Sequence, residues 1–132
     1  MRELFSTIAA VSTPPGKGGV AIIRISGDAT KNVIDKCFSP MAKQIPKDNP
    51  RRAIWGRVIK DGSAIDDALC TYFPAPNSYT GEDMAEISCH GGVLVTKQVL
   101  RAVLRDSHTP FDTASGTPQR QHQCFPWIPS TV

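Results

Sequence analysis

A sixteen-residue stretch, NSYTGEDMAEISCHGG at residues 77–92, places the strongest limits on how this chain folds. It begins as a polar loop, continues as an alternating run over Met84–His90, and ends in the pair Gly91-Gly92. Successive side chains of a strand point to opposite faces, so Glu86 lies on the face opposite Ile87. The stretch therefore predicts a loop, a strand and a turn, with one carboxylate held on the polar face of the strand.

A second charge interrupts an apolar strand earlier in the chain. VAIIRIS (Val20–Ser26) alternates as a strand, and Arg24 lies among its apolar residues. A charge in the middle of such a strand indicates either a mutual ion pair or a ligand contact, and the pattern alone leaves both open for Arg24 and Glu86. A carboxylate on a rigid strand suits a two-point hydrogen bond with an amino-pyrimidinone edge, which presents an N–H beside an NH₂.

The other elements follow from periodicity and turn signals. Lys60-Asp61-Gly62 lies between two strand-like runs and predicts a hairpin, because Asp-Gly tolerates the positive φ of a tight turn. Gly27-Asp28 ends the second strand, with Asp28 offered as a helix N-cap. Gly91-Gly92 leads into an amphipathic helix. The predicted elements are strands over 7–11, 20–26, 51–60, 63–73 and 84–90, helices over about 28–38 and 93–105, and a surface connection over 39–50.

This order of elements predicts the α/β (α+β) class, with a mixed sheet carrying two helices packed on one side. At 132 residues the chain suits one domain, which we place at residues 1–106. From Asp106 onward the composition changes, with four prolines and no lysine or leucine, and neither a helical nor a strand period is present. We therefore expect an irregular tail over 107–132. The abrupt change suggests the hypothesis that this tail is translated out of frame or comes from a truncated gene.

Composition narrows the class of protein further. No apolar run approaches the ~20 residues that span a bilayer, and the N-terminus does not fit a signal peptide, so we expect a cytoplasmic protein without a membrane partner. Four cysteines lie far apart and are expected to be reduced thiols. The formal net charge of +3 would permit an anionic partner, but the basic residues are scattered.

Two motifs resemble functional motifs but lack the spacing or the side-chain direction that those functions need. TPPGKGG lacks the GxxxxGK[ST] spacing of a phosphate-binding P-loop, so a glycine turn is the simpler interpretation. Cys89 and His90 are adjacent in a strand and point to opposite faces, which spoils both a thiol–imidazole dyad and a two-ligand metal site. The sequence therefore assigns no catalytic residue and no metal ligand.

Two long motifs carry a resemblance to a known family. STPPGKGGVAIIRISG and PAPNSYTGEDMAEISCHGG, with the hairpin between them, resemble the N-terminal domain of the bacterial tRNA-modifying GTPases of the MnmE (TrmE) family over about residues 6–105. The resemblance implies a tetrahydrofolate-binding domain that forms a homodimer, with 5-formyl- or 5,10-methylene-tetrahydrofolate as cofactor. It assigns Arg24 and Glu86 as the cofactor-binding residues.

The resemblance also implies partners and marks departures. Family proteins act with an FAD-containing protein, MnmG (GidA), on the wobble uridine of tRNA. Their PGEFTxRAFxNGK segment, which supplies a further folate contact, has no match in residues 107–132, so no third contact is assigned. GTP, Mg²⁺ and K⁺ belong to a GTPase domain whose motifs this chain lacks, so the chain is not expected to hydrolyse GTP by itself. The alternatives are a dimerisation module without a working folate site and a tRNA-binding module.

Overall fold

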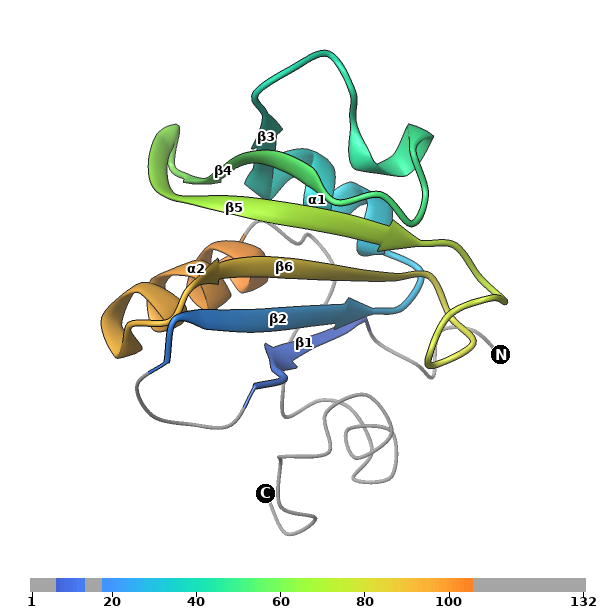
Figure 1. Ribbon diagram of the computed structural model, residues 1–132. Helices are drawn as coiled ribbons and strands as arrows, with labels where there is room; N and C mark the ends of the chain where they lie inside the picture. Colours follow the sequence, from blue (N-terminus) through green and yellow to red (C-terminus); the bar gives the residue numbers. More distant parts are fainter. Residues whose placement is uncertain (1–6, 14–17, 106–132) are drawn as a thin grey trace, which may run out of the picture.

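The computed structural model describes residues 7–13 and 18–105, which form a six-stranded sheet with two helices. The strands lie in the order β1-β2-β6-β5-β4-β3 across the sheet (Figure 1). Helices α1 (Thr30–Cys37) and α2 (Val93–Arg105) lie behind the sheet in that view. The strands are β1 (Ile8–Val11), β2 (Val20–Ser26), β3 (Phe38–Pro40), β4 (Ile54–Lys60), β5 (Ser63–Phe73) and β6 (Met84–His90).

The α+β class and the two packed helices agree with the prediction, but the mixed sheet was wrong. All five strand pairings of the described chain are antiparallel. The expectation of parallel neighbours rested on the strand–helix–strand order, which often builds a parallel pair. Here α1 carries the chain from β2 to β3 at the far edge of the sheet, and β6 then enters beside β2 in the opposite direction.

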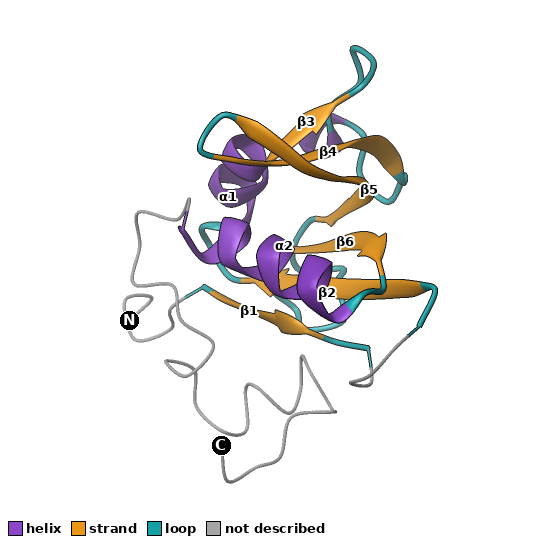
Figure 2. Cartoon of the chain, turned by 90° about the vertical axis from the view of Figure 1, so that its left-hand side faces the viewer, coloured by secondary structure: helices purple, strands orange, loops and turns teal. Residues whose placement is uncertain are grey.

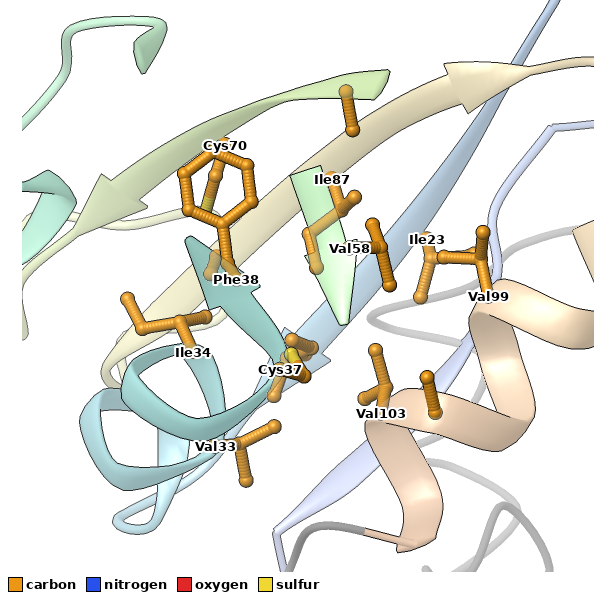
Figure 3. Packing of buried hydrophobic residues seen from close by; sticks show 14 of the residues in the cluster. Ile23, Val33, Ile34, Cys37, Phe38, Val58, Cys70, Ile87, Val99 and Val103 are labelled. Carbon is orange, nitrogen blue, oxygen red and sulfur yellow. The ribbon is translucent and has the colours of Figure 1, made fainter. Parts of the chain in front are cut away.

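The hydrophobic core lies between the helices and one face of the sheet. Ile23 of β2 and Ile87 of β6 are fully buried there, beside Val99 of α2 (Figure 3). Burying a side chain of this size contributes about 1.5–3 kcal/mol relative to leaving it exposed. The alternation predicted for β2 and β6 is therefore confirmed: residues 21, 23, 25, 85, 87 and 89 are buried in the core.

Helix α1 begins differently from the prediction. The N-cap position is Ala29, not Asp28, and no side chain caps it from that position. Instead the Thr7 hydroxyl oxygen accepts the Ala29 N–H at 2.8 Å, and the Thr30 hydroxyl donates to the Gly27 carbonyl at 2.7 Å. Thr7, a buried residue directly before β1, thus accepts a backbone N–H at the start of the helix. No local pattern around residue 28 predicts this role.

The predicted surface connection contains short structure. The edge strand β3 pairs with β4, and the 3₁₀ turn η2 (Pro46–Asp48) follows it. The sequence did not predict β3, because a strand of three residues is too short to show an alternating pattern. Pro40 is tolerated there because an edge strand does not need every backbone N–H for pairing. The hairpin between β4 and β5 is as predicted, with positive φ at both Asp61 and Gly62.

Neither helix of the described residues is long and apolar enough to cross a membrane. Figure 2 shows both helices against the strands from a second direction. The predicted irregular tail, 107–132, lies outside the described residues.

Candidate functional site

The sheet face opposite α1 and α2 carries the candidate site; we call it the open face. It is defined by the outward-pointing residues of β2, β6, β5 and β4, which include Arg24, Glu86, Leu69 and Trp55. Arg24 pairs across the strands with Glu86, and Glu86 pairs on its other side with Thr71. The two charges predicted from separate motifs therefore meet in the middle of the sheet.

Arg24 and Glu86 form an ion pair with good geometry. The Arg24 Nε donates to Glu86 Oε2 at 2.8 Å, and the side chains are 24% and 25% exposed. The ion-pair alternative left open by the sequence is thus present. A quarter of each side chain still faces solvent, so both groups remain reachable by a ligand. The pair can present a hydrogen-bond acceptor and a donor side by side.

A polar loop, residues 74–83, borders this pair; we call it the site loop. Its Tyr79 ring lies over the Arg24 guanidinium, with 5.2 Å from Arg24 Cζ to the ring centre. Ser26 ties the loop to β2, because its hydroxyl lies 2.8 Å from Thr80 Oγ1 and donates to Glu82 Oε1 at 2.7 Å. Sequence reasoning missed Tyr79 and Ser26, although an aromatic residue in the loop before β6 was a visible signal.

The end of the site loop is anchored by Asp83. Its carboxylate accepts the Ala75 N–H at 2.9 Å, and its backbone carbonyl accepts the Gly27 N–H at 2.9 Å and the Thr30 hydroxyl at 3.1 Å. Burial, followed by the nearby Asp83 charge, raises the pKa of Tyr72 to about 12, so its hydroxyl stays protonated. These contacts fix the loop to the start of α1 and to β5.

The other end of the open face is apolar. A shallow hollow of about 230 Å³ is lined there by Val20, Trp55, Leu69 and Ser88, among other residues. Val20, Trp55 and Leu69 are 59%, 54% and 42% exposed. Large apolar side chains that cluster in solvent mark a surface suited to contact with another molecule.

Cys89 and His90 behave as the strand pattern predicts. Cys89 is buried in the core, and burial raises its thiol pKa to about 11, so it is no nucleophile at neutral pH. His90 points to solvent, where its Nδ1 lies 2.7 Å from Asp66 Oδ1; this contact raises the pKa of His90. Within residues 7–13 and 18–105, no cluster of three acidic, histidine or cysteine side chains offers a metal site.

Fold and site together define an α+β domain with a polar ion-pair site at one end of its open face and an apolar hollow at the other. The sequence model described as "GTP-binding protein TrmE N-terminus" matches residues 7–115. The chain belongs to this family, which confirms the resemblance drawn from the two motifs. The matched range runs to residue 115, past residue 105 where the resemblance was expected to end, so the expectation that the family match excludes residues 107–132 was wrong for residues 107–115.

Relatives in several bacteria agree with this assignment. The "tRNA modification GTPase MnmE" of Clostridioides difficile is 44% identical over 99 residues, covering 74% of this chain and 22% of that protein. The protein of the same name from Akkermansia muciniphila is 46% identical over 113 residues, covering 84% and 24%. The Alkaliphilus metalliredigens protein is 38% identical over 117 residues, covering 86% and 25%. The chain thus spans about a quarter of the length of these relatives.

Proposed function

We propose that this chain is the N-terminal folate-binding and dimerisation part of a GTPase that modifies the wobble uridine of tRNA in the cytoplasm. The names of the relatives support the tRNA-modifying context. The observation that carries the folate proposal is the Arg24–Glu86 pair, which stands on an accessible sheet face and is supplied by both family motifs.

The site residues fit a reduced folate by the chemistry of their donors and acceptors. A pterin edge presents an N–H and an NH₂ side by side, and the Glu86 carboxylate accepts both. Arg24 holds that carboxylate through Nε, and its guanidinium places a positive charge beside the position of the ligand. When bound, the folate supplies a one-carbon unit. The chain's own residues bind and orient the folate rather than break bonds.

The apolar end of the open face supports the second half of the proposal. Exposed Trp55 and Leu69 would be removed from water if two copies of the chain met through this face. Interface centres are enriched in such aromatic and apolar side chains. The homodimer would then form on the same face as the folate site. In the longer protein, GTP, Mg²⁺ and K⁺ would bind to a separate domain, and an FAD protein of the MnmG (GidA) type would complete the reaction on tRNA.

Calorimetry with 5-formyltetrahydrofolate tests the folate site. Glu86→Ala leaves a pterin edge without its acceptor, which costs about 1–3 kcal/mol, or roughly tenfold or more in affinity. Glu86→Gln retains the size of the side chain and should also bind more weakly. Asp35→Ala is the matched control, because it removes the exposed ion pair between Asp35 of α1 and Lys47 of η2. Equal affinity in Glu86→Ala and Asp35→Ala refutes the assignment.

Oligomeric state and salt dependence separate the competing functions. A dimer that ignores 5-formyltetrahydrofolate points to the dimerisation module without a working site. Tight tRNA binding that falls steeply with salt points to the tRNA-binding module, since phosphate contacts release counterions.

A further inference from the structure

We propose that Tyr79 is a third binding residue of the Arg24–Glu86 site, and that its ring stacks on the flat heterocycle whose edge bonds to Glu86. This inference rests on the proposed function and adds to it. It assigns a role to the loop that joins β5 to β6, which the ion pair alone leaves unexplained.

The exposure of Tyr79 is the first observation. Its side chain is 64% exposed, whereas Tyr72, the other tyrosine, is buried at 4%. An aromatic side chain stabilises a fold mainly by the large area it removes from water. Tyr79 removes little, so its contribution to the core is small. Its contact with Arg24, at 5.2 Å from the ring centre, places it at the site instead.

The backbone on both sides of Tyr79 is held in place. The Ser78 hydroxyl donates to the Glu82 carbonyl, and Thr80 contacts the buried Ser26. The Gly81 N–H closes the turn onto the Ser78 carbonyl at 3.2 Å, with a positive φ of 81° at Gly81. The loop tip is therefore positioned before any ligand arrives. A ligand that contacts the ring pays little to order it, since only two side-chain torsions remain.

Arg24 sets the direction of the stack. Its guanidinium is held at Nε by Glu86 and is capped by the Tyr79 ring, in the arrangement of a cation–π contact. Ring, guanidinium and carboxylate therefore occupy one small region of the open face. A flat heterocycle that bonds edge-on to Glu86 extends from the carboxylate into this region. There the heterocycle can stack on the aromatic face of Tyr79, either beside the Arg24 guanidinium or in the position that the guanidinium now occupies.

Substitutions that separate ring shape from apolar area test the proposal. Tyr79→Phe keeps the aromatic face, Tyr79→Leu keeps apolar bulk without it, and Tyr79→Ala removes both. Calorimetry with 5-formyltetrahydrofolate should give affinities within about twofold for wild type and Tyr79→Phe. Affinity should fall between about threefold and tenfold for Tyr79→Leu and Tyr79→Ala, the range expected for one aromatic stack. The near-ultraviolet circular dichroism of the bound folate should change in the Leu variant and persist in the Phe variant.

A purely structural role for Tyr79 gives a different set of results. If the ring only shields the Arg24–Glu86 pair, thermal unfolding midpoints without ligand fall in parallel with affinity. Equal midpoints with divergent affinities support the stack. Equal affinities in Tyr79→Phe and Tyr79→Leu, with wild type binding, overturn the inference and leave the folate proposal standing. A wild-type chain that does not bind 5-formyltetrahydrofolate overturns the folate proposal itself, and the stack with it.

Discussion

Arg24 and Glu86 differ from the other lysine or arginine pairs of the described chain by their burial. Lys47–Asp35 and Arg57–Asp67 are considerably more exposed, and ion pairs of that kind contribute little to stability because water screens them. Removing one partner of a more buried pair leaves a charge with poor hydration, which is a larger penalty. A ligand that forms hydrogen bonds with both groups replaces part of the hydration that each charge has lost. Arg24 and Glu86 are therefore charges that a polar ligand on this face would stabilise.

His90 provides a residue-scale prediction on pH. Its contact with Asp66, reinforced by the charge of Asp67, raises the pKa of His90 above its ordinary value of 6.5. A raised pKa means that the folded chain binds the proton more tightly than the unfolded chain. The stabilisation is therefore fully present below pH 6.5 and is lost as the pH rises through the higher, folded pKa.

Asp66→Asn tests this linkage, because asparagine still accepts the His90 backbone N–H, which now bonds to Asp66 Oδ2 at 2.9 Å. NMR titration of the His90 ring should show a lower pKa in the variant. Urea unfolding should show a wild-type advantage that is larger at pH 5.5 than at pH 8.5. An advantage that grows with pH contradicts the assignment.

Sequence patterns reached some of these residues and missed others for a physical reason. Arg24 and Glu86 were predicted because a charge breaks a strand's apolar alternation, and alternation is local. The contacts of Thr7 with Ala29 and of Ser26 with Glu82 join segments more than twenty residues apart. Tyr79 stands in a loop, where no period marks the direction of a side chain. Such residues become visible only when the chain is folded.

At the scale of elements, the turn between β6 and α2 depends on a close approach of two backbones. The Gly91 N–H donates to the Gly19 carbonyl at 3.3 Å, and a Cβ on Gly91 would lie 2.1 Å from the Gly18 carbonyl oxygen. Backbone atoms cannot give way as a flexible side chain can. The glycine run before β2 and the glycine pair after β6 are therefore one packed unit, although the sequence shows them as separate turns.

Gly91→Ala should destabilise the fold by about 1–3 kcal/mol, the usual cost of forcing an atom into a filled space. Gly92→Ala is the matched control, since a Cβ there meets nothing within 4 Å. The Gly92 carbonyl accepts the first helical N–H, from Thr96 at 2.9 Å, and alanine retains that carbonyl. Urea denaturation of both variants measures the difference. Equal losses in the two would show that the contact with Gly18 does not constrain the turn.

Element order predicted the class of fold better than the direction of its strands. Periodicity located β2, β6, α1 and α2, because each buries one face against the core. It carried no information on which strand lies beside which, and so the sheet was expected to be mixed. Strand order depends on where the connection through α1 ends, and that is set by packing across the whole sheet.

At the scale of the molecule, the two faces of the sheet differ in what covers them. One face is sealed by α1 and α2 over the core, while the open face presents the ion-pair site and the apolar hollow. A cluster of exposed large apolar side chains such as Trp55 and Leu69 marks a surface suited to contact with another molecule. The proposed dimer and folate site would share this face, so that binding of one partner affects the surface available to the other.

A charge placed in the hollow tests whether two copies meet there. Leu69→Arg puts a guanidinium on the open face, where dimer formation would have to bury it without a partner, whereas Leu94→Arg changes an exposed leucine on α2. Burying an unpaired charge in an interface costs several kcal/mol, so sedimentation equilibrium should show Leu69→Arg as a monomer at concentrations where wild type and Leu94→Arg are dimers. A far-ultraviolet circular dichroism spectrum like that of wild type, with cooperative thermal unfolding, would exclude misfolding as the cause, whereas the midpoint itself should fall because dimer formation stabilises the folded chain. Dissociation by Leu94→Arg alone would place the interface on the helical side instead, because only a buried position responds to an added charge.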